Sequence, residues 1–260
     1  MLKKAFKLGI SIFLIPILAI TLQSCISTSE SHNQDTCFDL SSLESGTFST
    51  LEGKDLDFML YVPEDTSKEL PLVVYLHGFS SKGDDLNLLT KTEDFPKYLA
   101  DGFFEDVEAF VLIPQLSEEY HSWNEVNDEL YQLIQTILKV YNIDKDNISL
   151  SGFSMGGTAT WGFASIYPEL FARIAPISGS AKSILENASE LKNIAVWAFV
   201  GSDDSVISPD SSIKMVDMLD SYGGDAAITE FEQAEHEEVS PLAWSYDDKN
   251  LFAWLINNEE

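Results

Sequence analysis

Short apolar runs alternate with amphipathic segments along most of this chain of 260 residues, and this alternation limits the possible folds more than any other feature. The run at residues 72–76 is continuously apolar, as expected for a strand that is buried on both faces of a parallel sheet. Similar runs predict further strands at residues 56–62, 110–113, 148–150, 174–177, 195–200 and 227–231.

Helical periodicity appears between the expected strands. Over residues 126–141, apolar side chains recur every three or four positions, which would place an apolar stripe against a sheet. Residues 155–167, 211–222 and 250–257 show further helical patterns. Strands that alternate with crossover helices predict an α/β fold with a doubly wound, mostly parallel sheet. Ligands of such sheets bind beyond the carboxyl ends of the strands, so we expect the chemistry there.

The chain is strongly acidic, with 15 basic residues, 43 acidic residues and a formal net charge of −28 at pH 7. Such a chain repels phosphate backbones and anionic lipid headgroups, so we expect no nucleic-acid partner. Two cysteines, Cys25 and Cys37, are too few for a disulfide framework or a cysteine-rich metal site. Because the histidines include no helical His-x-x-x-His pair, we expect neither a metal ion nor a cofactor.

The N-terminus has the pattern of a secretory signal. Three lysines within the first eight residues precede an apolar run at residues 10–22 that is too short to span a membrane comfortably. The tetrapeptide Leu-Gln-Ser-Cys that ends at Cys25 resembles the lipobox of bacterial lipoproteins, in which the cysteine becomes the lipid-modified first residue. The alternative is an uncleaved anchor helix. We therefore expect a signal peptide at residues 1–25 and a protein outside the cytoplasm, either anchored to a cell membrane or secreted.

The segment after this signal differs in composition from the rest of the chain. Residues 26–45 are rich in serine, threonine, asparagine and aspartate and show little periodicity, so we expect a flexible tether. No internal repeat and no later shift in composition marks a second domain. Residues 46–260 are therefore expected to form one domain.

The strongest motif is Gly-x-Ser-x-Gly at residues 152–156, which lies between an expected strand and an expected helix. A nucleophile on such a tight turn adopts strained backbone angles, so Gly152 and Gly156 meet a need for very small neighbours. The turn also places Ser154 Oγ near a helix N-terminus, which favours developing negative charge. The motif therefore predicts Ser154 as a nucleophile. The alternative is a glycine-rich turn used only for close packing.

Serine needs a base to activate it and an acid to orient that base. Of the four histidines, only His236 follows Ser154, which suits the chain order Ser, Asp, His of nucleophiles on such turns. The alternative for His236 is a solvated residue within an acidic stretch. The acid is expected after the strand at residues 195–200, where Asp203 and Asp204 both qualify. Spacing does not separate them, and either one also suits a turn or a helix N-cap.

An oxyanion hole requires two backbone N–H donors. One is expected from Met155, directly after the nucleophile. The other is expected from Phe79, because Gly78 lets the chain turn sharply after the strand at residues 72–76. We interpret His77 as a residue that braces this loop, with a second base as the alternative.

From about Leu56 to the C-terminus, the sequence resembles the α/β-hydrolase superfamily. Within it, the chain is similar to bacterial secreted esterases related to polyhydroxybutyrate depolymerases, feruloyl esterases and the catalytic domain of prolyl oligopeptidases. The resemblance rests on segments at residues 70–78, 83–85, 114–115 with Trp123, 151–157, 160–161, 167–172 and 201–204. It implies a catalytic domain at residues 46–260 that hydrolyses carboxylic esters through an acyl-enzyme.

The resemblance also bears on single site residues. The family pattern Gly-x-x-Asp favours Asp204 over Asp203 as the acid of the triad. The sequence departs from the family at Glu235, where the family has glycine before the histidine, and at Ser208, where it often has proline. Neither departure removes a catalytic group.

The expected pocket is open and shallow, because the segment between residues 177 and 194 is too short for a domain-sized cap. Phe79 and Trp123 are candidates for aromatic pocket walls. The anionic surface disfavours phospholipid and polyuronate substrates, so we expect a neutral polysaccharide-borne ester or an aryl ester. Two alternatives remain: a serine peptidase of the prolyl oligopeptidase type, and a surface-binding lipoprotein without turnover.

Overall fold

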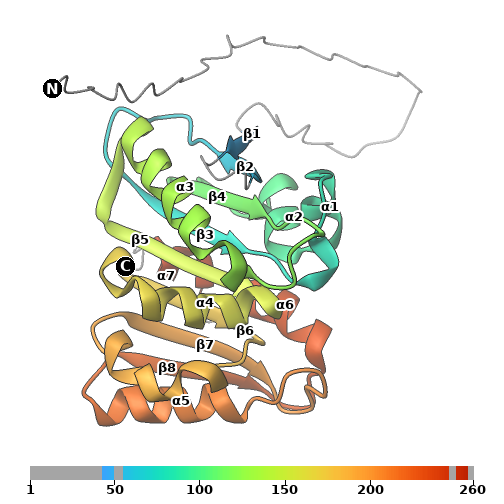
Figure 1. Ribbon diagram of the computed structural model, residues 1–260, viewed down its shortest axis with the longest axis vertical. Coiled ribbons are helices and arrows are strands. Elements are labelled where there is room, and N and C mark those ends of the chain that lie inside the picture. The colour runs from blue at the N-terminus through green and yellow to red at the C-terminus, as the bar shows by residue number, and fades with distance from the viewer. Residues whose placement is uncertain (1–42, 50–54, 246–249, 257–260) are drawn as a thin grey trace, which may run out of the picture. The chain divides into compact units, whose positions relative to one another are not determined.

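The computed structural model describes residues 43–49, 55–245 and 250–256 (Figure 1). The predicted signal peptide, Cys25 and the predicted tether as far as residue 42 lie outside the described residues. Within the described ranges, no helix is long and apolar enough to cross a membrane.

The strands of the described ranges form a sheet in the order β1-β2-β4-β3-β5-β6-β7-β8. Their bounds are β1 Leu43–Ser49, β2 Asp55–Tyr61, β3 Leu70–Leu76, β4 Phe110–Gln115, β5 Ile143–Phe153, β6 Arg173–Ile177, β7 Ala195–Gly201 and β8 Ala226–Phe231. The β1–β2 and β2–β4 ladders are antiparallel, and every ladder from β4 to β8 is parallel. The predicted α/β fold with a mostly parallel sheet is therefore confirmed.

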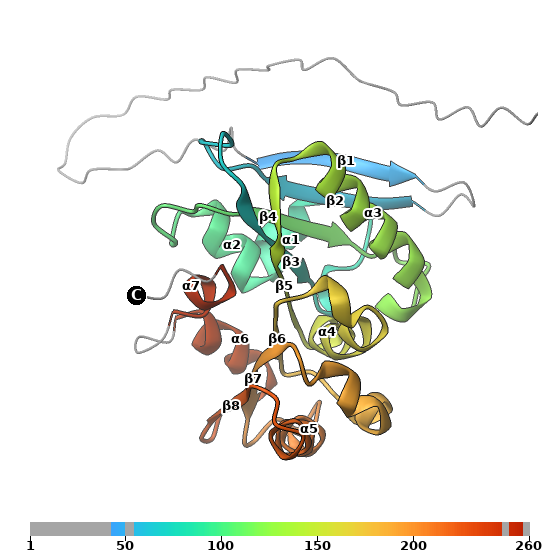
Figure 2. The same cartoon turned by 90° about the vertical axis from the view of Figure 1, so that its left-hand side faces the viewer.

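Helices cover both faces of this sheet (Figures 1 and 2). The α-helices are α1 Asn87–Thr92, α2 Asp94–Ala100, α3 Asn127–Val140, α4 Met155–Ile166, α5 Asp210–Ser221, α6 His236–Trp244 and α7 Leu251–Leu255. Helices α3, α4 and α5 contribute to one hydrophobic cluster, and α1, α2, α6 and α7 contribute to the other. The sheet is therefore doubly wound, as its sequence pattern predicts.

Strand β3 shows why its sequence is continuously apolar. Leu72, Val74 and Leu76 belong to the cluster under α3, α4 and α5, whereas Val73 and Tyr75 belong to the cluster on the opposite face. All five side chains are fully buried. Successive side chains of a strand point to opposite faces, so a strand covered on both sides has no position for an exposed polar residue.

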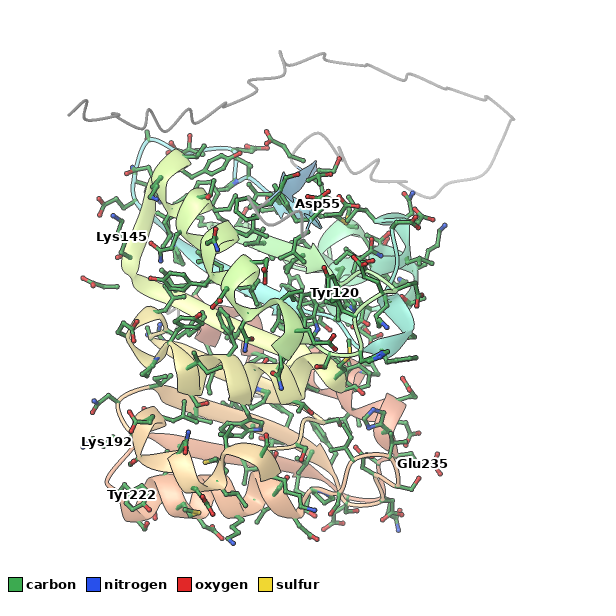
Figure 3. All side chains as sticks on the ribbon, viewed as in Figure 1. Asp55, Tyr120, Lys145, Lys192, Tyr222 and Glu235 are labelled. Carbon is green, nitrogen blue, oxygen red and sulfur yellow. The ribbon has the colours of Figure 1, made fainter. Side chains whose placement is uncertain are left out.

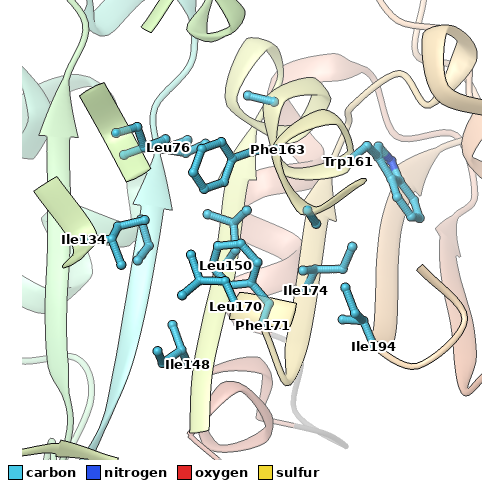
Figure 4. Close-up of a cluster of buried hydrophobic side chains, with 14 of the residues drawn as sticks. Leu76, Ile134, Ile148, Leu150, Trp161, Phe163, Leu170, Phe171, Ile174 and Ile194 are labelled. Carbon is cyan, nitrogen blue, oxygen red and sulfur yellow. The ribbon is translucent and has the colours of Figure 1, made fainter. Parts of the chain in front are cut away.

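The core beside α4 holds the predicted nucleophile segment in place. Leu76, Ile134, Leu150, Phe163 and Ile174 meet there from two helices and three strands, and all are buried (Figure 4). Burial of large apolar side chains of this kind contributes about 1.5–3 kcal/mol each. This packing fixes α4 against β5, so the turn between them has a defined position.

A glycine brings α4 into direct contact with the sheet. A Cβ atom added to Gly156 would lie 1.8 Å from the carbonyl oxygen of Leu76. No side chain fits at that distance, so the first turn of α4 rests on the carboxyl end of β3. The turn that carries Ser154 therefore lies beside the loop that follows β3.

Four elements were not predicted from the sequence: β1, α1, α2 and α6. Strand β1 begins at Leu43, three residues before the expected start of the domain and inside the expected tether. Its sequence, Leu-Glu-Ser-Gly-Thr-Phe-Ser, has no apolar run because it pairs only with β2 at an edge of the sheet. Helices α1 and α2 are too short to show periodicity, and α6 begins with acidic residues and contains Pro241.

Charged side chains lie on the outside of the described domain. Lys145, Lys192 and Glu235 are exposed and project outward in Figure 3. Most ionised side chains of the described residues are thus hydrated, so the net charge of −28 does not require the burial of many charges.

Candidate active site

Ser154 lies on a sharp turn between β5 and α4. Its backbone has φ 57° and ψ −112°, a conformation that non-glycine residues rarely adopt. The Ser154 N–H donates to the carbonyl oxygen of Ile177 at 2.9 Å, which ties the turn to the end of β6. A Cβ atom at Gly152 would lie 2.6 Å from the Leu76 carbonyl oxygen. The strand, tight turn and helix that the motif requires are all present.

Three side chains from distant segments form a hydrogen-bonded chain. Ser154 Oγ lies 2.8 Å from His236 Nε2, and His236 Nδ1 lies 2.7 Å from Asp204 Oδ2. Because a carboxylate only accepts, Nδ1 carries the proton and donates to Asp204. Nε2 therefore has a free lone pair that accepts the Ser154 hydroxyl proton. His236 and Asp204 are buried, at 5% and 7% exposure.

Asp204 is held by the loop that follows β7. Its Oδ1 accepts the backbone N–H groups of Val206 at 3.0 Å and Ile207 at 2.8 Å. These bonds orient the carboxylate so that Oδ2 faces His236. Asp203, the other candidate, is exposed, and its carboxylate accepts from the hydroxyl of Ser202 at 3.1 Å. The geometry therefore separates the two aspartates that spacing alone leaves equivalent.

His236 is the first residue of α6, and the residue before it caps that helix. Glu235 and Glu238 form a capping box, in which the Glu235 N–H donates to Glu238 Oε2 at 2.9 Å. The preceding loop is tied to the loop of the acid, because the Asp203 N–H donates to the Ala234 carbonyl oxygen at 3.2 Å. Glu235, which departs from the family pattern, thus has a structural role at the start of α6.

The loop after β3 lies next to this chain of side chains. Within the described residues, the N–H groups of Phe79 and Met155 donate to no acceptor, so both remain available to a ligand. Phe79 begins a short 3-10 helix at residues 79–81, and the residue is 65% exposed. Lys82 Nζ lies 4.9 Å from the centre of that ring.

His77 braces this loop, as expected. The Leu116 N–H donates to His77 Nε2 at 2.9 Å, so Nδ1 carries the proton and donates to the Gly78 carbonyl oxygen at 2.6 Å. Burial lowers the pKa of His77 to about 4 and keeps the ring neutral near pH 7. Neither ring nitrogen is free to act as a second base.

Trp123 lies behind the loop, not on the pocket wall where we expected it. The side chain is 1% exposed, its Nε1 donates to the His77 carbonyl oxygen at 3.1 Å, and its ring packs edge-on against that of His77. An indole that is buried on all sides offers no face to a ligand. Phe79 is exposed at the loop and stays a candidate for contact with substrate.

The site has no domain-sized cover from the segment between β6 and β7. That segment consists mainly of a 3-10 helix, Lys182–Leu191, whose Leu191 and Ala188 pack into the core. Two cavities, of about 280 Å³ and 420 Å³, lie elsewhere: one beside α3 and the start of β5, the other beside α6 and α7. Within the described residues, no group of three or more His, Cys, Asp or Glu side chains is placed to hold a metal ion.

Glu93 is a buried carboxylate beside the loop of Phe79 that no sequence motif predicts. It stands in the polar stretch Thr-Glu-Asp, which is typical of an exposed helix start. The sequence signal near it is the apolar character of Leu89 before it and Phe95 after it; the structure shows that both are buried.

Comparison with known proteins places this arrangement in a family. The sequence model of the dienelactone hydrolase family matches residues 105–251. A curated relative, the bifunctional acetylxylan esterase/xylanase of Neocallimastix patriciarum, is 27% identical over 162 residues, which are 60% of this chain and 22% of that protein. The chain thus spans about a fifth of the length of this relative.

Solved structures of esterases share the fold. A thermostable esterase aligns with a TM-score of 0.71 and 28% identity over 84% of this chain and 63% of that chain. A ferulic acid esterase aligns with a TM-score of 0.63 and 15% identity over 84% of this chain and 98% of that chain, which is a likeness of fold alone.

The family match covers more than half of the chain and includes Ser154, Asp204 and His236. The expected superfamily is confirmed, and the feruloyl esterases named in the resemblance are similar in fold. The chain belongs to the dienelactone hydrolase family of the α/β-hydrolase superfamily.

Proposed function

We propose that this protein is a serine carboxylesterase in which Ser154 is the nucleophile, His236 the base and Asp204 the acid. The observation that carries the proposal is the continuous hydrogen-bonded chain of 2.8 Å and 2.7 Å that joins the three side chains. Its geometry matches the requirement that a nucleophile and its base lie within about 2.6–3.2 Å of each other. Membership of a hydrolase family supports the same conclusion.

The proposed reaction has two halves. Ser154 Oγ attacks the ester carbonyl carbon while His236 Nε2 takes the hydroxyl proton, and the carbonyl oxygen becomes an oxyanion. When the tetrahedral intermediate collapses, His236 returns the proton to the departing alcohol and an acyl-enzyme remains. Water then attacks the acyl carbon and gives its proton to His236 Nε2, which returns it to Ser154 Oγ as the bond from Oγ to the acyl carbon breaks and the carboxylic acid leaves. Asp204 holds the imidazole in the reactive tautomer and stabilises the imidazolium in both halves.

The oxyanion is proposed to bind the N–H groups of Met155 and Phe79. Met155 begins α4, so its N–H also lies at the positive end of the helix. Fixed donors of this kind act where charge develops, and the loss of one costs roughly 3–4 kcal/mol of transition-state stabilisation.

The substrate class is proposed to be esters borne on neutral polysaccharides, or aryl esters. One curated relative is named as an acetylxylan esterase. The exposed Phe79 ring offers an apolar face beside the proposed oxyanion donors. The net charge of −28 disfavours anionic polymers.

The protein is proposed to act outside the cytoplasm, with Cys25, the last residue of the predicted signal segment at residues 1–25, as the site of lipidation and with residues 26–42 as part of the tether. The lysine-rich start and the Leu-Gln-Ser-Cys sequence support this part of the proposal. Labelling with a fatty-acid analogue in a bacterial host tests it. We expect the wild type to be labelled and Cys25→Ser to be unlabelled; an unlabelled wild type contradicts lipidation.

The decisive experiment for the activity is reaction with a fluorophosphonate probe. We expect the wild type to be labelled and Ser154→Ala to be unlabelled. In a separate assay, the wild type is expected to hydrolyse esters, with p-nitrophenyl acetate, a methyl ferulate-type ester and acetylated xylan as the substrates tested. Absence of labelling and of ester hydrolysis by the wild type would point to a non-catalytic binding protein. Labelling with cleavage of short peptides but of no ester would point to a peptidase.

A further inference from the structure

We propose that Glu93 is a positioning residue of this esterase, because its carboxylate fixes the loop from which the Phe79 N–H reaches the oxyanion. This inference rests on the proposed function. Glu93 does not touch the reacting atoms; it acts through the loop.

The contacts of Glu93 are directed at this loop. Glu93 Oε1 accepts the Gly78 N–H at 2.9 Å and the Ser81 hydroxyl at 2.5 Å. Glu93 Oε2 accepts the Tyr75 hydroxyl from β3 at 2.8 Å. The residue is only 2% exposed, so water does not compete for these bonds. One carboxylate therefore joins the end of β3 to both ends of the turn that contains Phe79.

The orientation of the Phe79 N–H follows from these bonds and from His77. The peptide unit between Gly78 and Phe79 is planar, so its C=O and N–H point in opposite directions. His77 Nδ1–H holds the Gly78 carbonyl oxygen at 2.6 Å, and Glu93 holds the N–H of the preceding peptide unit at 2.9 Å. Because its own C=O and the N–H of the preceding unit are both held, this peptide unit cannot rotate freely. The Phe79 N–H is thereby aimed away from His77.

A structural role at α2 does not account for Glu93. The residue occupies the N-cap position of α2, where a side chain ordinarily accepts from the N–H groups of the first helical turn. Its side chain makes no such bond and turns to the loop instead. Although Glu93 stands at the N-cap position of α2, its carboxylate does not cap the helix.

The charge of Glu93 matters for this role. A carboxylate accepts at both oxygens, and bonds from N–H or O–H to a charged acceptor are stronger than neutral ones. The pKa of Glu93 is raised to about 7 because it is buried. The hydrogen bonds from Ser81, Tyr75 and Gly78 lower the pKa, but their effect is smaller than that of burial. Protonation near neutral pH therefore weakens the hold on the loop.

The elements around Glu93 carry further titratable side chains. They are Tyr75 of β3, His77 directly after β3, Lys82 after the 3-10 helix, Lys91 of α1, Asp94, Lys97 and Tyr98 of α2, and His236, Glu237 and Glu238 of α6. Tyr75 is hydrogen bonded to Glu93, and the negative charge of Asp94 raises the Glu93 pKa. Lys82 faces the Phe79 ring instead. The Phe153 ring lies beside that of His236, with 5.1 Å between their centres.

The test compares Glu93→Gln with Asp94→Asn, which removes the neighbouring charge but touches neither the loop nor the site. In Glu93→Gln the amide keeps the shape and an acceptor for Gly78, but the charge is gone. We expect kcat for p-nitrophenyl acetate to fall about tenfold or more with KM changed less than about twofold, since only transition-state stabilisation is lost. The affinity for a trifluoromethyl ketone, whose adduct places an oxyanion in the hole, is expected to fall in parallel with kcat.

The pH profile supplies a readout that a merely structural role would not move. We expect the acid limb of kcat/KM in the wild type to reflect two ionisations, and that of Glu93→Gln only one. Asp94→Asn should keep both, with one displaced to lower pH, because removal of the Asp94 charge lowers the Glu93 pKa. The inference is overturned if Glu93→Gln matches Asp94→Asn in kcat, inhibitor affinity and the steepness of the acid limb.

Two further outcomes are distinguishable. If Glu93→Gln does not fold by circular dichroism, Ser81→Ala decides, because it removes one bond to Oε1 and leaves the charge; an unchanged kcat in that variant overturns the inference. If the wild type itself neither reacts with the fluorophosphonate nor hydrolyses esters, the proposed function fails. An active wild type with an equally active Glu93→Gln defeats the inference alone.

Discussion

Ser154 shows how much of a site is decided by a single backbone conformation. With φ at 57°, the residue stands on a turn that lifts its hydroxyl from β5 toward His236. Strain of this kind costs about 1–3 kcal/mol and persists only where the surroundings enforce it. Here the bond to the Ile177 carbonyl oxygen and the close approach of Gly156 to Leu76 enforce it.

The first prediction at the residue scale separates the two aspartates. Asp204→Asn should lower kcat by about 10⁴-fold, because the amide at that position favours the wrong imidazole tautomer. Asp203→Asn should leave kcat within about twofold, since an exposed polar residue away from the reacting groups contributes little. Steady-state kinetics with p-nitrophenyl acetate measures both. Equal losses in the two variants would contradict the assignment of Asp204.

The second prediction concerns Glu93 and the pH dependence of stability. Its folded-state pKa of about 7 lies above the ordinary value of 4.5, so between these values the folded state binds more protons than the unfolded state. The contribution of Glu93 to the free energy of unfolding of the wild type therefore decreases as pH rises through that window. Glu93→Gln lacks the effect, so its stability relative to the wild type should increase from pH 5 to pH 8.

Urea denaturation at a series of pH values measures this difference. His77 contributes a slope of opposite sign, because its pKa is lowered to about 4 by burial and the unfolded state binds the extra proton below pH 6.5. This slope is present in both proteins and cancels in the comparison. A difference that does not vary with pH would contradict the buried, titrating state of Glu93.

At the scale of elements, the strands except β1, the long helices and α7 were predictable, whereas α1, α2 and α6 were not. Helix α3 has apolar side chains at regular spacing because a single face of it packs on the sheet. Helix α6 begins with His236, Glu237 and Glu238, which are residues that a sequence pattern assigns to a solvated loop. Its formation depends on Val239 and Ala243 packing into the core beneath it, a contact made by the fold.

The contact of α4 with β3 gives a prediction with a matched control. Gly156→Ala would place a Cβ atom 1.8 Å from the Leu76 carbonyl oxygen, so α4 must move away from the sheet. We expect a loss of stability of about 1–3 kcal/mol or more and a loss of activity, because the added atom meets backbone, and no flexible side chain can move aside.

The control is Gly162→Ala in the same helix. There the added Cβ would meet only Asn124 Oδ1 at 3.6 Å, an ordinary contact. Alanine is a better helix former than glycine, so this variant should gain about 0.5–1 kcal/mol. Thermal unfolding of both variants gives the comparison. Similar behaviour of the two would show that Gly156 is not under steric constraint.

At the scale of the whole molecule, the parallel sheet gathers residues that are far apart in the chain. Ser154, Asp204 and His236 follow β5, β7 and β8, and all three strands end at the same edge of the sheet. Ser154 and His236 are 82 positions apart, yet their side chains meet at 2.8 Å. The sheet order, with β6 between β5 and β7, sets the span that the three side chains bridge.

The net charge gives a prediction at this scale. A formal charge of −28 makes the folded chain repel itself, and dissolved salt screens that repulsion. An increase in NaCl from low to about 0.5 M at pH 7 should raise Tm by about 2–4 °C, which corresponds to about 1 kcal/mol for a domain of this size. Calorimetry at constant pH measures the shift. An unchanged or lowered Tm would show that the acidic side chains are not mutually destabilising.

The sequence by itself determined most of the strands, the helices α3, α4, α5 and α7, and the turn of Ser154, and it made His236 the candidate base. These features depend on hydrophobic spacing and on the steric needs of a few consecutive residues, such as Gly152 and Gly156, and those forces act over short stretches of chain.

The family resemblance already favoured Asp204 over Asp203, but only the tertiary structure shows Asp204 bonded to His236. Only the tertiary structure, too, shows Trp123 buried behind the loop and Glu93 bonded to the loop of Phe79. Each of these outcomes depends on which side chains from separate segments meet across the sheet edge. That is set by strand order and by the packing of helices on both faces, and no local pattern in the chain records it.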